Sequence, residues 1–145
     1  MAKCKLVALT TPLPGKEAEF HDWYQNTHLP EIIAIPGFQG AQRFQLVAKM
    51  MGADENQYLA IYDAESDNPG ALMAAMGEMA QSGKMTPPIY QDMATTYTAL
   101  FSEYGERVEA KGGLQDVPVV VICSGDIQPK NGVQARESLS ERVCC

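Results

Sequence analysis

Two histidines, the only tryptophan and an arginine lie within one short stretch of the chain, from residue 21 to residue 44. An imidazole titrates near neutral pH, so His28 is a candidate general acid or base. A guanidinium offers a planar fork of donors, so Arg43 could bind a carboxylate or phenolate, or stabilise an enolate as its charge develops. Together these residue types could support proton transfer by His28 on a substrate whose oxyanion Arg43 holds.

Both residues also have a structural interpretation. The His28 ring could cap backbone carbonyls where a helix ends, and it would then stabilise the fold without moving a proton. Arg43 could instead form an ion pair, with Glu31 or Asp63 as its partner. The sequence leaves these alternatives open.

Aromatic side chains around this stretch could form the walls of a pocket for a flat substrate. Tyr62 and Tyr97 are expected at strand positions whose opposite face meets the helices, which favours them as pocket residues. Trp23 and Tyr24 could contribute as well, although such residues more often belong to the core. His21 stands beside an aspartate and is expected to be solvated.

A helix is expected to position His28. Residues 15–26 contain no proline, and large side chains recur here with the spacing of one buried stripe. That stripe consists of Phe20, Trp23, Tyr24 and Thr27. Pro30 disfavours helical geometry at Leu29, so the helix is predicted to kink or end close to His28. The imidazole would then lie near the negative end of a helix dipole, which favours its protonated form.

The pattern over the rest of the chain predicts an α+β protein with the ferredoxin-like order β-α-β-β-α-β. The expected strands are residues 3–11, 38–47, 57–63 and 92–104, and the expected helices are residues 15–26 and 69–81. Arg43 would share its strand face with small or polar residues. Both faces of the last strand are at least half apolar, yet two helices can cover only one face of a sheet. The other face therefore needs a second covering surface.

The segment WYQNTHLPEIIAIPGF, followed by AQRF, resembles the EthD-like group of the dimeric α+β barrel superfamily. The resemblance extends over residues 3–104 and concerns an aromatic helix, a His-x-Pro sequence and a Pro-Gly-Phe turn into the second strand. It implies a homodimer in which two antiparallel four-stranded sheets pair face to face as a barrel. It does not specify a reaction, because the superfamily includes cofactor-free oxygenases, isomerases, polyketide cyclases, dehydratases and haem enzymes.

Together with His28 and Arg43, this resemblance implies a cofactor-independent enzyme that moves a proton on a small aromatic or polyketide-like carbonyl compound. The reaction would be of the lyase or isomerase type: a dehydration, cyclisation, isomerisation or decarboxylation. One alternative is a cofactor-free monooxygenase, since a base that forms a carbanion could prime the substrate for dioxygen. The other is a non-catalytic dimer that binds a small apolar molecule or serves in a stress response. No cofactor and no metal are expected.

Composition limits the partners. The 145-residue chain has a net charge of −7 and scattered basic residues, so nucleic acid and anionic membranes would repel it. No segment has the apolar length of a membrane span or a secretory signal, which indicates a cytoplasmic protein. The four cysteines form no CxxC pair and lack zinc-site spacing. Cys144 and Cys145 are expected to belong to a frayed terminus.

The predicted ferredoxin-like domain comprises residues 1–105, and residues 106–145 form a C-terminal extension. Within this extension, residues 117–123 are a β-branched run that would promote aggregation if exposed. They are therefore predicted to dock as an extra strand.

Overall fold

The computed structural model of the protein describes residues 1–111, and it confirms the α+β class. Met1–Lys49 and Ala53–Arg107 form one compact unit that contains every described helix and strand. These are β1 (Ala2–Thr10), α1 (Glu17–Trp23), the π-helical turn η1 (Tyr24–His28), α2 (Leu29–Ile33), β2 (Phe38–Gln45), β3 (Tyr58–Ser66), α3 (Pro69–Gln81) and β4 (Tyr97–Ser102). The predicted strand at residues 117–123 and the terminal cysteines lie outside the described residues, so the extension stays a prediction.

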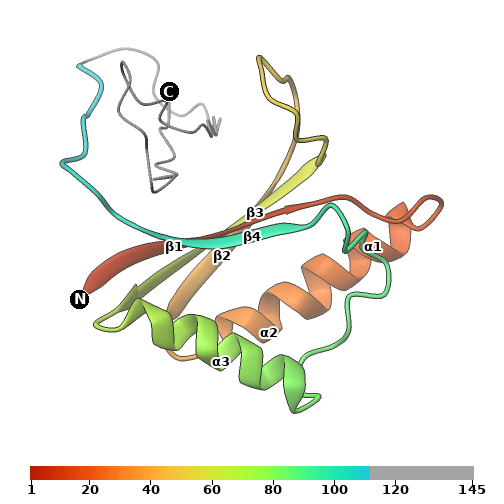
Figure 1. The fold of residues 1–145 in the computed structure, drawn as a ribbon, viewed down its shortest axis with the longest axis horizontal. Helices are drawn as coiled ribbons and strands as arrows, with labels where there is room; N and C mark the ends of the chain where they lie inside the picture. The colour runs from red at the N-terminus through yellow and green to blue at the C-terminus, as the bar shows by residue number, and fades with distance from the viewer. Residues whose placement is uncertain (112–145) are drawn as a thin grey trace, which may run out of the picture. The chain divides into compact units, whose positions relative to one another are not determined.

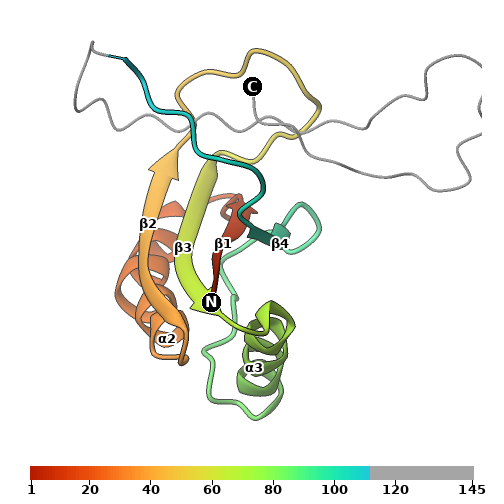
Figure 2. The same cartoon turned by 90° about the vertical axis from the view of Figure 1, so that its left-hand side faces the viewer.

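The four strands form one antiparallel sheet in the order β2-β3-β1-β4. β1 lies in the centre, paired with β3 on one side and β4 on the other. The helices lie on one side of this sheet (Figure 1), and Figure 2 shows the molecule turned by 90°, with β2 and β3 at full length. This is the ferredoxin-like arrangement that the sequence predicts. Within residues 1–111 no helix combines the length and the apolarity needed to cross a bilayer.

The two faces of the sheet differ in burial. Side chains on the helix-facing side are buried and mostly apolar: Cys4, Leu6, Ala8, Ala60, Tyr62 and Ala64. The open side carries half-exposed apolar side chains: Val7, Leu9, Phe44, Leu59, Ile61, Tyr97, Ala99 and Phe101. Removal of water from the helix-facing side stabilises the single protomer, whereas the open side keeps apolar surface in contact with solvent.

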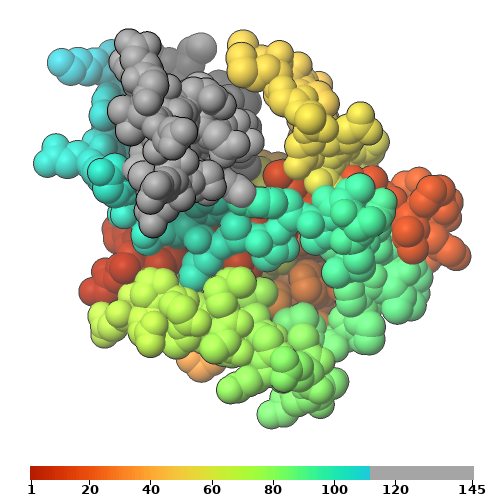
Figure 3. All heavy atoms as spheres, viewed as in Figure 1, coloured from red at the N-terminus to blue at the C-terminus, as the bar shows by residue number. Residues whose placement is uncertain are grey.

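The last strand is shorter than predicted. β4 begins at Tyr97, and the residues before it form a turn instead of a strand. The Asp92 carboxylate accepts a hydrogen bond from the Ala94 N–H, and the Asp92 carbonyl accepts one from the Thr96 hydroxyl. Such local side-chain bonds compete with a strand ladder, which explains the late start of β4. Backbone hydrogen bonds also connect this region to the loop at residues 11–13. The two segments lie side by side in the space-filling view of Figure 3.

The sequence predicts that the helix kinks or ends close to His28, and the structure shows that it continues through this residue by way of a π-helical turn. His28 and Leu29 both have right-handed helical dihedral angles, and α2 continues to Ile33. The backbone N–H of Leu29 donates to the Tyr24 carbonyl, which is the wider π-type spacing. Pro30 has no N–H to donate and its ring needs room in the preceding turn, so the wider turn accommodates the proline without breaking the helix.

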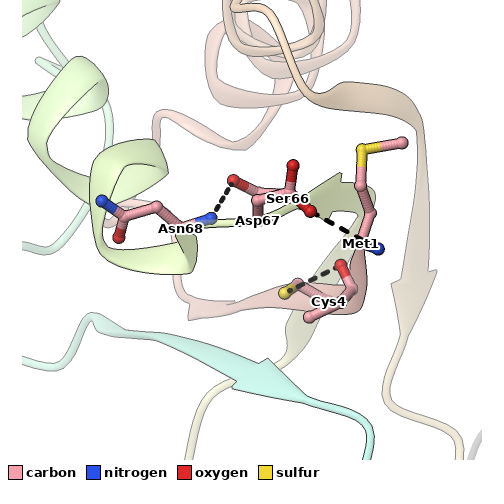
Figure 4. Close-up of polar contacts among 6 residues, drawn as sticks. Met1, Cys4, Ser66, Asp67 and Asn68 are labelled. Atoms are coloured by element: carbon pink, nitrogen blue, oxygen red, sulfur yellow. Dashed lines mark hydrogen bonds and ion pairs between the residues drawn. The ribbon is translucent and has the colours of Figure 1, made fainter.

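The connection from β3 into α3 shows how the second helix begins. Asn68 occupies the cap position of α3 without a side-chain capping bond, and its own N–H donates to the Ser66 hydroxyl at 3.0 Å (Figure 4). Cys4 lies nearby with a buried free thiol whose Sγ is 3.7 Å from the Ala2 carbonyl oxygen. Both contacts are local, since each joins residues two apart in sequence.

Candidate functional site

A cluster of aromatic and cationic side chains lies between the helices α1 and η1 and the strands β2 and β3. Four of the six predicted site residues meet there: Trp23, Tyr24, His28 and Arg43. Tyr62 joins them from β3 through its hydroxyl. Tyr97 is the exception, as described below.

Arg43 is half-buried and packs against aromatic rings. Its guanidinium carbon lies 4.6 Å from the ring centroid of Tyr24, 5.5 Å from that of Phe20 and 5.8 Å from that of Tyr58. Such cation–π contacts partly replace the water that the guanidinium loses. Burial lowers the pKa of Arg43. The predicted small and polar neighbourhood is therefore wrong: the register places Arg43 on the helix-facing side, where the rings are.

The predicted ion pairs of Arg43 are not formed. Asp63 pairs with Lys5 on the open side of the sheet. The Glu31 carboxylate accepts hydrogen bonds from the Thr86 N–H at 3.1 Å and from the Thr86 hydroxyl. Within residues 1–111, Arg43 has no carboxylate partner at ion-pair distance.

His21 has a role that the sequence did not indicate. Its Nδ1 lies 2.9 Å from Nη2 of Arg43, and its ring meets the Tyr58 ring edge to face with centroids 4.6 Å apart. The pKa of His21 is lowered, chiefly by burial and secondarily by the Arg43 charge. The expectation of a solvated His21 is therefore wrong. Its position three residues before Tyr24 was the available signal, since that spacing places both on one helix face.

His28 packs inside the aromatic cluster. Its ring stacks on Trp23 with centroids 4.7 Å apart and meets Tyr24 at 4.9 Å. Burial lowers the pKa of His28 to about 4, against a smaller opposing effect of the Glu31 charge. The sequence-based expectation of a protonated ring is wrong, because desolvation outweighs any benefit from the helix dipole. His28 Nδ1 is buried and has no hydrogen-bond partner in the described part of the chain, so it caps no carbonyl.

We expect the low pKa of His28 to make stability depend on pH. Above about pH 6.5 the ring is neutral in both the folded and the unfolded chain, and its contribution is complete. Below that pH the unfolded chain takes up a proton that the folded chain rejects down to about pH 4, so stability falls. Urea unfolding of wild type should show a loss of about 1 to 3 kcal/mol from this group between pH 7 and pH 4.5. The His28→Phe variant should lack this loss, so the difference between the wild-type and variant stability curves should show it. Parallel curves would contradict the buried neutral ring.

The tyrosines predicted to shape one pocket lie on different faces of the sheet. Tyr62 is cross-strand partner of Leu6 and is fully buried toward the helices, where its hydroxyl donates to the Tyr24 hydroxyl at 3.4 Å. Burial raises the pKa of both phenols. Tyr97 is the partner of Leu9 on the open side. Tyr62 thus lies on the helix-facing side of the sheet, whereas the sequence predicts it on the other side. Tyr62 and Tyr97 therefore cannot line one pocket within a single chain.

The surface has two hollows of about 410 Å³ each, and one of them touches this cluster. One is lined by Trp23 together with α1 and the loop at residues 86–90, and the other lies at the Lys3–Lys5 end of the sheet. Of the predicted site residues, Trp23 is the one that lines either hollow. The indole Nε1 is buried without a hydrogen-bond partner among residues 1–111. No three His, Cys, Asp or Glu side chains in that part of the chain converge on a metal-binding point.

The fold and the cluster define a ferredoxin-like α+β protein with a cationic, aromatic site beneath its first helix. An EthD (ethyl tert-butyl ether D) family protein from Bacillus halodurans C-125 matches this structure over 72% of this chain and 100% of its own, with 25% identity and a TM-score of 0.51. A candidate monooxygenase from Shewanella loihica PV-4 matches over 77% of this chain and 99% of its own, with 17% identity and a TM-score of 0.47. No protein-family profile and no curated protein matches the sequence. The predicted resemblance to the EthD-like group is confirmed by the first of these structures.

Proposed function

We propose that the protein binds a small aromatic or polyketide-like carbonyl compound and transfers a proton on it without a cofactor. His28 is the general base in this proposal, and Arg43 stabilises the oxyanion that forms when the proton leaves carbon. The products would be those of a lyase or an isomerase. The similarity to an EthD family protein supports a small-molecule site on this fold and leaves the reaction to be established.

The observation that carries this proposal is the state of the His28 ring. A base must be unprotonated before it acts, and burial keeps His28 neutral at physiological pH. Its Nδ1 has no protein partner in the described chain, so a substrate proton can be its partner. A buried ring nitrogen without a partner costs stability, which a purely structural residue would not be expected to retain.

Arg43 supplies the charge that the reaction needs. Its guanidinium lies over the Tyr24 ring, and the His28 ring meets the same ring edge to face. Both groups therefore surround one buried phenol, whose hydroxyl is held by Tyr62. A cation at a half-buried position stabilises a developing enolate more than the same cation in water would.

Proton exchange tests this function directly. Benzoylacetone is an aromatic 1,3-dicarbonyl compound whose carbon acid exchanges with D₂O, and NMR follows that exchange without knowledge of the final product. We expect wild-type protein to accelerate the exchange above the buffer rate in proportion to protein concentration. No acceleration with this or related aromatic ketones would favour the non-catalytic binding function instead.

The proposed site belongs to a homodimer. The half-exposed apolar residues of the open sheet face are continuous across β1, β3 and β4, and a second copy of the same face is the complementary surface. A stable interface buries about 800 Å² per partner, which a sheet face of this kind can provide. Tyr97 would then lie inside the barrel formed by the pair.

Sedimentation should accordingly give twice the mass of the chain at micromolar concentration. Ile61→Lys places a charge in the middle of the open face and should shift the protein toward a monomer, because an unpaired buried charge is costly. Gln81→Lys, at the exposed end of α3, adds the same charge elsewhere and should leave the mass unchanged. A well-folded wild-type monomer would contradict the dimer.

A further inference from the structure

We propose that His21 and Arg43 together bind a carboxylate, so that the aromatic carbonyl substrate of the proposed site also carries an acid group. This inference rests on the proposed function and adds the class of its substrate. It follows from the Arg43 contacts, the orientation of the His21 ring and the rings that surround both.

The charge of Arg43 is not balanced within the described chain. The guanidinium is half-buried, it contacts three aromatic rings, and its side-chain hydrogen bond goes to His21, a neutral group. The aromatic faces offset part of the desolvation of a cation but supply no anion. Most of its N–H donors thus remain for a ligand. A carboxylate matches the planar fork with two parallel hydrogen bonds.

Arg43 also determines which nitrogen of His21 carries the proton. A guanidinium has donors only, so Nδ1 at 2.9 Å must accept, and the proton of the neutral ring resides on Nε2. That Nε2–H has no partner among residues 1–111, which makes it a second donor. The ring is held by edge-to-face contacts with Tyr58 and Phe20, at 4.6 and 5.3 Å between centroids. Glu17, one turn earlier, is the carboxylate whose charge acts on His21, and it is exposed.

The surroundings favour an aromatic body on the carboxylate. Three rings surround the guanidinium, and of these Phe20 and Tyr24 are fully buried while Tyr58 is partly exposed. A ligand whose carboxylate reaches Arg43 therefore brings its remainder against Tyr58. A flat ring can pack on an aromatic ring, whereas a methyl group covers little of its surface. The expected ligand is therefore a benzoate-like acid.

Isothermal titration of the full chain with benzoate, benzamide and acetate tests the inference. Benzamide keeps the ring and lacks the charge, and acetate keeps the charge and lacks the ring. We expect benzoate to bind at least about tenfold more tightly than either compound. Benzamide loses the charge-assisted bidentate contact, and acetate loses the ring contact.

Variants show whether the two residues are responsible. His21→Phe keeps the ring contacts and removes both nitrogens, so its Kd for benzoate should rise about tenfold or more. His21→Gln offers an acceptor and a donor and should stay within about threefold of wild type. Arg43→Lys loses the planar fork and should weaken binding about tenfold or more. The matched control, Lys84→Gln, removes an exposed positive charge on the loop after α3 and should change Kd by less than about twofold.

The inference is overturned if benzoate does not bind at millimolar concentration, if benzamide binds equally well, or if His21→Phe and Arg43→Lys bind benzoate like wild type. Its failure is distinguishable from failure of the proposed function. Accelerated exchange of benzoylacetone without benzoate binding would overturn the carboxylate site alone. Benzoate binding that depends on both residues, without any proton exchange, would support the carboxylate site and overturn proton transfer.

Discussion

Replacement of His28 by phenylalanine is expected to reduce proton exchange of benzoylacetone by about 10² to 10⁴ while the protein stays folded. The phenyl ring can keep the stack on Trp23 and the contact with Tyr24, so packing is retained. It removes the buried Nδ1 that has no partner in the described chain, which should leave the free energy of unfolding at pH 7.5 unchanged or slightly higher. Loss of activity without loss of stability is the signature of a proton-transfer group.

His28→Gln is the companion variant. Glutamine keeps a polar side chain but loses the ring stack and the titratable nitrogen, so it should lose about as much exchange activity and about 1 to 2 kcal/mol of stability. The rate of exchange in wild type should fall at low pH as His28 becomes protonated, with a midpoint near its lowered pKa of about 4. Wild-type exchange in both variants would remove His28 from the mechanism. In that case the binding of a small ligand without catalysis would become the preferred function.

The fold could be predicted from the sequence because several independent local signals agree. Alternating strands, the Pro36–Gly37 turn and the proline at the start of α3 all specify the same order of elements. The errors come from local competition that periodicity does not show. Asp92 bonds to its own neighbours and shortens β4, and Pro30 is accommodated by a π-helical turn where a kink or an end of the helix was expected.

The site was predicted in part for a similar reason. Residue type and spacing identified His28 and Arg43 as candidate site residues, and the structure places both against Tyr24. Burial, however, depends on which strand face meets the helices, and alternation alone cannot assign that face. For this reason the predictions of a protonated His28 ring and of the strand faces of Arg43 and Tyr62 were wrong. His21 was missed because its partner is 22 residues away in sequence and on another element.

Gly37→Ala is expected to be the most destabilising small substitution near the site. Gly37 has a φ of +105°, a conformation that alanine adopts only with strain. A Cβ at this position would lie 2.7 Å from Cδ2 of Leu72 and 3.2 Å from the carbonyl oxygen of Glu65, so the Leu72 side chain would have to move and the β3 backbone would have to give way slightly. Strain and overpacking together should lower the free energy of unfolding by about 3 to 5 kcal/mol.

Two other glycines separate the causes of that loss. Gly15 has a φ of +74° and open space around its Cβ position, so Gly15→Ala should show strain alone, about 1 to 2 kcal/mol. Gly40 has neither a left-handed φ nor a close neighbour, so Gly40→Ala should change stability by less than about 0.5 kcal/mol. Urea unfolding of the three variants measures the series. Equal losses of unfolding free energy in Gly37→Ala and Gly15→Ala would mean that the Leu72 side chain moves aside freely. A loss in Gly37→Ala as small as that in Gly40→Ala would contradict the left-handed conformation of Gly37. The turn matters for the site because it joins the helix of His28 to the strand of Arg43, and its geometry determines whether the two residues meet the same ring.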